Sequence, residues 1–402
     1  MSSLTTPIRD ARADRPARNA ARAVPHIALR FDGVLLLAII GLCAGSLVTI
    51  AYATPDDVPG DPHYYVLRQA IFFGVGLLFA TGLALFDYSR LREWRYAVYG
   101  LLISGILAVQ FLGSVSRGSR RSIQLPFFEI QFSELGKVLL VVALAGFLVD
   151  RARSTNAWGT TLKIMVLALV PAGMVIAQDL GSGTVYVIVG LVVLFVAAVP
   201  WRSFAAIFAV FAVGAACALV VAPKAGVEVL KPYQRDRLTA FLHPTENPAK
   251  QGYQQNQSRI AIGAGQKTGR GDRATQTKLN FLPEHHTDFI FAVVGERWGF
   301  VGAAFVLSMY ALLIWRALRI LTMAKNMFGA LVAGGIVGML LFEVFVNVGM
   351  NIGIAPITGI PLPLFSYGGS SVLSTFLAIG LLQSIHAQAR IAATQKGRIQ
   401  AL

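Results

Sequence analysis

The chain has 402 residues, of which 55% are hydrophobic and only 14% charged, and its formal net charge at pH 7 is +15. Soluble domains are about 25% charged, so this composition excludes a disordered chain and argues against a soluble α/β enzyme, whose large core needs a polar coat. Together with a mean hydropathy of +0.62, it predicts an all-α polytopic membrane protein. The two cysteines, Cys43 and Cys217, both fall in apolar runs, so neither a disulfide framework nor a zinc pattern is expected.

About ten apolar runs follow one another along the chain, each close to the roughly 20 residues that cross a bilayer. The predicted spans are Phe31–Ala53, Val66–Phe86, Tyr96–Val115, Phe132–Val149, Leu162–Ala177, Gly183–Val199, Phe204–Val221, Phe289–Trp315, Phe328–Ile354 and Ser371–His386. The short break between the fifth and sixth spans, residues 178–182, predicts a tight turn between two helices.

The chain divides into one membrane domain, residues 31–390, which contains one long loop, and a tail at each end. Residues 1–30 form a basic tail rich in arginine, alanine and proline, which we expect to be disordered beside anionic lipid. Residues 223–288 form a long loop between the seventh and eighth spans, and residues 391–402 form a short C-terminal tail.

Lysine and arginine predict the orientation. With the N-terminus inside, the inner segments carry nineteen of these residues and the short outer loops only four, so both termini are predicted to be cytoplasmic. The long loop then lies outside, where its ten lysines and arginines imply an anionic partner. A nucleic acid is not expected there, whereas a lipid that carries pyrophosphate fits.

Ionisable residues inside predicted spans are costly and therefore candidates for function. Glu134 and Lys137 are three residues apart on one helix face, where they can pair, and a purely structural ion pair is as good an interpretation as a functional one. Glu343 is better interpreted as a packing or polar-network residue. Asp179, in the turn between the fifth and sixth spans, is better interpreted as a helix N-cap.

Asp288 lies where the long loop enters the eighth span. A carboxylate that loses hydration against this apolar boundary becomes a stronger base, so Asp288 is a candidate general base, with a helix N-cap as the equal alternative. Its neighbours Glu284, His285 and His286 invite a metal-site interpretation, but their spacing matches no zinc pattern.

Residues 347–371 contain three prolines and five glycines and cannot form one continuous helix. Irregular backbone at membrane depth is tolerated only where it is buried in protein or lines a cavity. This stretch therefore predicts a re-entrant element or an ordered outer loop beside a substrate cavity.

Three of these segments resemble the SEDS family (shape, elongation, division, sporulation), the peptidoglycan glycosyltransferases that include RodA and FtsW. Gln131–Lys137 is similar to the family's "QPSE-x-x-K" segment, Leu282–Ala292 to its "LPE-x-HTDFIFA" segment, and Gly353–Ser371 to its C-terminal signature. The resemblance covers residues 31–390. Segments 231–237 and 257–263, with Thr275–Gln276, are more similar to RodA than to FtsW.

The resemblance implies an enzyme that polymerises lipid II into glycan strands during cell-wall elongation and shape maintenance. Asp288 would be the general base, undecaprenyl pyrophosphate the leaving group, and the donor configuration would invert. Developing negative charge would be stabilised by Arg121, Lys137, Arg235 and Arg237. A divalent cation, Mg²⁺ or Mn²⁺, would assist them, and no other cofactor is implied.

The resemblance also implies supporting residues and partners. Glu134 would hold Lys137, and His286 would support the Asp288 loop. Ser366 and Ser370, in the C-terminal signature, would bind substrate or support the site. The implied partners are a class B penicillin-binding protein and other membrane proteins of the elongation complex, in the bacterial cytoplasmic membrane.

The chain departs from the family pattern at Ser122, Phe132, Gln178 and Arg297. The first three change local backbone stiffness and stacking, and the sequence offers no account of Arg297. Two other functions stay open: a lipid II flippase or other polytopic transporter, and a catalytically inactive scaffold. A transporter expects polar groups at the bilayer midplane and internal repeats, whereas an enzyme expects its ionisable cluster at one interface.

Overall fold

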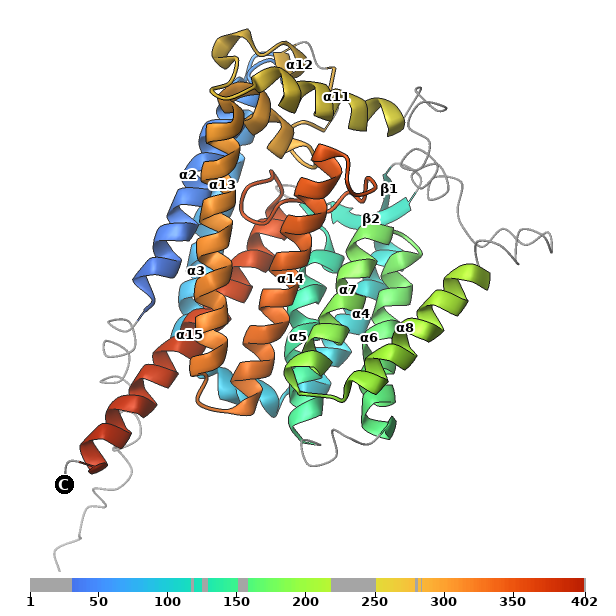
Figure 1. The fold of residues 1–402 in the computed structure, drawn as a ribbon, viewed down its shortest axis with the longest axis vertical. Helices are drawn as coiled ribbons and strands as arrows, with labels where there is room; N and C mark the ends of the chain where they lie inside the picture. Colours follow the sequence, from blue (N-terminus) through green and yellow to red (C-terminus); the bar gives the residue numbers. More distant parts are fainter. Residues whose placement is uncertain are drawn as a thin grey trace, which may run out of the picture.

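The computed structural model describes residues 31–116, 119–124, 129–150, 158–217, 251–278, 281–282 and 284–400. The predicted basic tail and the part of the long loop that carries Arg235 and Arg237 lie outside these residues. Within them the chain is a bundle of long helices with a small sheet at one end (Figure 1).

Eight described helices are long and apolar enough to cross a membrane, and two shorter apolar helices accompany them. The eight are α2 (Gly33–Ala53), α3 (Tyr64–Leu85), α4 (Arg95–Leu112), α5 (Phe132–Val149), α6 (Trp158–Ile176), α13 (Ile290–Met323), α14 (Met327–Ile352) and α15 (Gly369–Gln400). The two shorter ones are α7 (Leu180–Val196) and α8 (Trp201–Ala216). Each predicted span therefore overlaps a described helix, which confirms the all-α polytopic fold.

Several helices begin at a side chain that satisfies the free N–H groups of the first turn. Asp32 accepts from the Leu35 N–H (3.0 Å) at the start of α2. Asp179 accepts from the Gly181 N–H (3.0 Å) at the start of α7, which confirms its predicted role as an N-cap and the predicted turn before it.

Helices α5 and α14 are largely buried in the bundle, whereas α4 is largely exposed. Helix α8 lies at the edge of the bundle (Figure 1). α14 packs against α13, α7, α5 and α15, while α2 packs on α13, and α3 on α15. The segments before and after the long loop are thus interleaved in one core. The site described below draws on both halves of the chain for this reason.

The end of the bundle that is predicted to be outside carries the irregular elements. Strands β1 (Ser114–Ser116), β2 (Ser119–Gln124) and β3 (Glu129–Ile130) form an antiparallel sheet in that order, with Ile123 opposite Ile130. The sequence analysis did not predict this sheet. Helices α11 (Gln251–Gly265) and α12 (Thr275–Lys278) and a 3-10 turn, η4 (Gly271–Arg273), come from the predicted long loop.

Arg297 now has a structural account. It lies in the second turn of α13, its guanidinium is 3.6 Å from the centre of the Tyr52 ring, and it pairs with Asp272 at 2.7 Å. Two residues later Gly299 has a φ of 62° and interrupts the helix, with the loop after α11 packed against it. Arg297 therefore ties the end of α2 and the η4 turn to the kinked start of α13.

Candidate active site

Asp288 sits on a short turn, residues 284–289, that leads into α13. The N-cap position of α13 is Phe289, and no side chain caps the helix, so the alternative role of Asp288 as an N-cap is not seen. Asn347 and Asn351, one turn apart on α14, both donate to the backbone carbonyl of Asp288, at 3.0 Å and 3.1 Å. The backbone at Asp288 is held by two buried amides, and its half-buried side chain is not needed for that anchoring.

The segment between α14 and α15, residues 353–368, returns against this turn and packs on it. Ser366 donates to the carbonyl of Thr287 at 2.6 Å, and the Tyr367 N–H donates to the carbonyl of His286 at 2.9 Å. The ring of His286 lies 4.5 Å from that of Tyr65. Ser366 thus bonds to the Asp288 turn, and His286, within the turn, packs against α3.

This irregular segment is largely buried, so its carbonyl groups need partners from the bundle. Five polar side chains among the described residues supply them: Ser46 donates to Phe365 (2.8 Å), Gln69 to Ser366 (3.1 Å), Gln255 to Ala355 (2.9 Å), Tyr310 to Pro363 (2.6 Å) and Asn347 to Ile360 (2.8 Å). The donors lie on α2, α3, α11, α13 and α14. The structure thus contains the ordered element that the prolines and glycines predicted.

A cavity of about 400 Å³ opens between the Asp288 turn, the sheet and the start of α15. Three predicted site residues line it: Asp288, Arg121 and Ser370. Arg121 donates to the Gln178 carbonyl at 3.0 Å, and Ser370 donates to the Glu129 carbonyl at 3.0 Å. These bonds join the sheet to α15 and to the turn before α7.

The cavity wall also contains ionisable residues that the sequence analysis did not assign to the site. They are Arg68, Glu129, Asp179 and Glu284. Arg68 is one of the four basic residues of the short outer loops. No pattern marked it, because α3 reaches the cavity by packing on α15, far along the chain. With Asp288 and Arg121, the lining holds four carboxylates and two guanidinium groups.

Glu134 and Lys137 do not line this cavity. Lys137 is 1% exposed and pairs with Glu134 (2.8 Å) and with Glu343 on α14 (2.6 Å). The predicted pair is confirmed, and Glu343 joins it as the polar-network residue that was expected. The three side chains satisfy one another inside the bundle.

The remaining departures from the family pattern have local partners. Ser122 bonds to Glu129, and both line the cavity. The ring of Phe132 packs on Gly105 of α4, where it leaves no room for a Cβ. Gln178 supplies the carbonyl that receives Arg121. Arg235 and Arg237 lie outside the described residues.

The bundle of membrane-spanning helices defines an integral membrane protein. Its candidate site is a cavity lined by carboxylates and arginines near one membrane face. The chain belongs to the FtsW/RodA/SpoVE family of cell cycle proteins, whose model matches residues 29–391. The resemblance drawn from the sequence is thereby confirmed, and the protein is a multi-pass protein of the bacterial inner membrane.

Relatives match over almost the whole chain. The peptidoglycan glycosyltransferase MrdB of Escherichia coli K12 is 35% identical, over 89% of this chain and 94% of its own. The peptidoglycan glycosyltransferase RodA of Treponema pallidum is 32% identical, over 89% and 98%. A probable peptidoglycan glycosyltransferase FtsW of Thioalkalivibrio sulfidiphilus is 36% identical, over 90% of both chains.

Two solved structures share the fold. A chain from a peptidoglycan synthase complex, studied for its coordination of polymerization and crosslinking, superposes with a TM-score of 0.75 at 31% identity and covers 90% of this chain and 99% of its own. The rod shape determining protein RodA of Thermus thermophilus superposes with a TM-score of 0.65 at 28% identity, over 89% and 97%.

Proposed function

We propose that this peptidoglycan glycosyltransferase polymerises lipid II into glycan strands during cell-wall elongation, with Asp288 as general base. Relatives named as peptidoglycan glycosyltransferases support the enzyme class. One observation carries the assignment of the base: Asp288 lines a polar cavity together with Arg68 and Arg121, on a turn anchored by two buried asparagines.

The chemistry needs few groups. The acceptor sugar hydroxyl loses its proton to Asp288 as its oxygen attacks the anomeric carbon of the donor, and the bond to undecaprenyl pyrophosphate breaks. Attack opposite the leaving group converts an α-linked donor into a β-linked product. Pyrophosphate leaves without general-acid help, so it needs cationic stabilisation, which Arg121 and Arg68 supply from the cavity wall.

The cavity wall also suits a hard divalent cation. Its carboxylates, Glu129, Glu284, Asp179 and Asp288, offer the oxygen ligands that Mg²⁺ and Mn²⁺ prefer. A cation that arrives with the pyrophosphate would balance the excess of carboxylates over arginines and strengthen the binding of the leaving group.

The lipid tails need an apolar path beside this cavity. A groove of about 660 Å³ runs between α2 and α13 and is lined mainly by apolar side chains, among them Val48, Val301 and Phe305. These side chains are 48%, 62% and 51% exposed, so the groove opens on the lipid-facing side of the bundle. We assign the undecaprenyl chain of one substrate to it.

The proposed partner is a class B penicillin-binding protein, which would cross-link the peptide stems of the new strands. Similarity to a chain of a synthase complex that couples polymerization and crosslinking supports this pairing. Other membrane proteins of the elongation complex complete the proposed assembly.

Polymerisation of purified lipid II tests the proposal. The wild-type chain and Asp288→Asn are compared with and without the class B partner, in Mg²⁺ and in Mn²⁺. We expect polymer from the wild type and a loss of roughly 100-fold or more from Asp288→Asn, because general-base catalysis contributes about 10²–10⁴-fold. Asp61→Asn, at an exposed carboxylate of the α2–α3 loop, is the matched control and keeps full activity.

Each other result has a definite meaning. Polymer from Asp288→Asn at the wild-type rate removes Asp288 from the reaction. A folded wild type that makes no polymer under any of these conditions favours a flippase or a scaffold. An enzyme is favoured over a transporter because the ionisable residues that line the cavity gather at one end of the bundle.

A further inference from the structure

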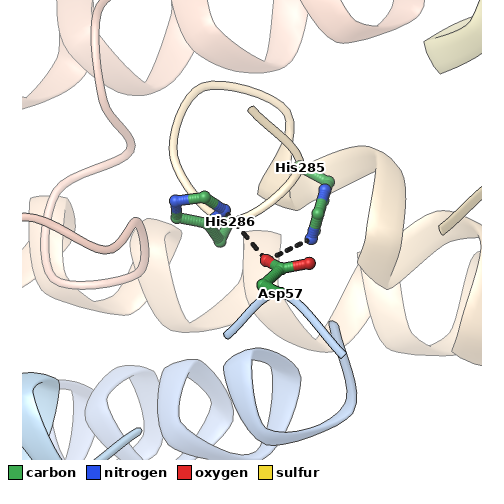
Figure 2. Close-up of side chains that lie close together, drawn as sticks. All are labelled: Asp57, His285 and His286. Carbon is green, nitrogen blue, oxygen red and sulfur yellow. Dashed lines mark ion pairs between the residues drawn. The ribbon is translucent and has the colours of Figure 1, made fainter. Parts of the chain in front are cut away.

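Three side chains of types that bind metal ions lie close together at the Asp288 turn. Asp57 comes from the loop between α2 and α3, and His285 and His286 come from the turn itself (Figure 2). The Asp57 Oδ2 atom lies 3.1 Å from His285 Nε2 and 3.7 Å from His286 Nδ1. The side chains are only 13%, 5% and 17% exposed, so this cluster is shielded from solvent.

The hydrogen bonds of His285 define which of its ring nitrogens carries the proton. Its Nδ1 atom is 3.1 Å from the carbonyl oxygen of Leu282, which can only accept. Nδ1 is therefore the protonated nitrogen, and in a neutral ring Nε2 presents a lone pair. That lone pair faces the Asp57 carboxylate, which is also an acceptor, so the contact requires either a second proton or a cation between them.

A metal ion meets this requirement well. Histidines that bind metals usually donate their other ring N–H to a backbone carbonyl or carboxylate, as His285 does to Leu282. Zinc bonds of about 2.0–2.1 Å in a tetrahedron place neighbouring ligand atoms roughly 3.3 Å apart. The distances from Asp57 Oδ2 to His285 Nε2 (3.1 Å) and to His286 Nδ1 (3.7 Å) lie on either side of that value. All three ligand atoms lie within 4.8 Å of one another.

We propose that Asp57, His285 and His286 bind one divalent transition-metal ion, with Zn²⁺ as the best fit and water in the fourth position. Two imidazoles and one carboxylate form a donor set that suits zinc better than the all-oxygen set preferred by Mg²⁺. The ion fastens the turn that carries Asp288 to the α2–α3 loop. None of its three ligands lines the cavity, so its role is to position the turn.

The test uses the full chain, prepared without a histidine tag, treated with chelator and then titrated with Co²⁺ and with Zn²⁺. We expect one ion per chain, a visible Co²⁺ spectrum typical of four- or five-coordinate nitrogen and oxygen ligands, and a higher melting temperature with Zn²⁺. Loss of a residue that only supports a metal ligand lowers metal affinity by roughly 10- to 100-fold. Asp57→Asn and His285→Gln remove a ligand itself and should lower the affinity by more.

The same region offers matched controls. Asp56→Asn and His63→Gln change an exposed carboxylate and an exposed imidazole between α2 and α3 and should bind metal like the wild type. The proposal is overturned if the wild type binds neither ion at one per chain, or if Asp57→Asn binds both as tightly; His285 and Asp57 then form a proton-mediated ion pair.

The wild-type titration decides the matter even where a variant fails to fold. Metal binding is measured without lipid II, so it stands or falls separately from the proposed polymerisation.

Discussion

Two clusters of ionisable side chains among the described residues differ in their access to solvent. Lys137, Glu134 and Glu343 are paired at 2.6–2.8 Å and almost fully buried between α5 and α14. The group around Asp288 and Arg121 lines a cavity of about 400 Å³. In the first cluster Lys137 contacts both carboxylates away from solvent, whereas the second cluster faces a cavity that a substrate could enter.

The contrast shows that a charge at membrane depth is an ambiguous sign of function. Both clusters contain residues that are costly in hydrocarbon, and both lie in segments typical of the family. What separates them is access: the triad is enclosed between helices, whereas the second group lines a cavity. The triad is expected to support the fold, and the cavity group to support the reaction.

The largest expected effect breaks the triad. Lys137→Met leaves Glu134 and Glu343 buried without their cation, and removal of one partner from a buried ion pair costs about 3–5 kcal/mol. We expect a large fall in melting temperature and in folded yield, measured on purified protein. Lys163→Met, at an exposed position on α6, is the control and should change neither.

A second variant separates charge from packing in the triad. Lys137→Met combined with Glu343→Gln removes one of the two opposed carboxylates and should recover part of the lost stability. If Lys137→Met melts like the wild type, the triad does not support the fold in the way described.

The next effect concerns the cavity. Arg121→Gln should lower the polymerisation rate by roughly 100-fold, as when one preorganised donor to a developing charge is removed. The melting temperature should change little, because the variant loses one hydrogen bond to the Gln178 carbonyl, worth about 1 kcal/mol. Arg273→Gln, at an exposed position in η4, should keep full activity. Equal rates for both variants would remove Arg121 from the site.

The smallest effect extends the comparison to the other end of the bundle. Burial raises the pKa of Asp32, but the hydrogen bond from Arg316, the Leu35 N–H and the charge of Arg316 outweigh it and hold the pKa below its ordinary value of 3.8. A carboxylate whose pKa is lowered by folding stabilises the protein above its unfolded pKa and loses that contribution as pH falls through the folded pKa.

Asp32→Asn should therefore cost about 2 kcal/mol near neutral pH, as for hydrogen bonds to a charged group. The difference in melting temperature from the wild type should shrink as pH falls below 3.8. Asp150→Asn breaks exposed pairs with Arg92 and Arg95, and such surface pairs contribute about 0–1 kcal/mol. A pH-independent difference for Asp32→Asn would contradict the proposed cause.

Much of the site could be predicted because its local signals are strong. Asp288 stands at a boundary between polar and apolar sequence, Asp179 precedes a helix, and Glu134 and Lys137 share a helix face. Arg68, Glu129, Asn347 and Asn351 carry no such signal. Arg68 and Glu129 reach the cavity, and Asn347 and Asn351 the Asp288 carbonyl, only because distant segments of the chain pack together.

The amino-acid sequence by itself determined that this chain spans a membrane many times, where its helices lie and which family it resembles, because hydropathy and short motifs are local properties. Tertiary structure alone decided that Glu343 joins the predicted Glu134–Lys137 pair, that Arg121 faces the cavity, and that Asp57 meets His285 and His286. These pairings depend on which helices pack together, and packing joins residues that are hundreds of positions apart.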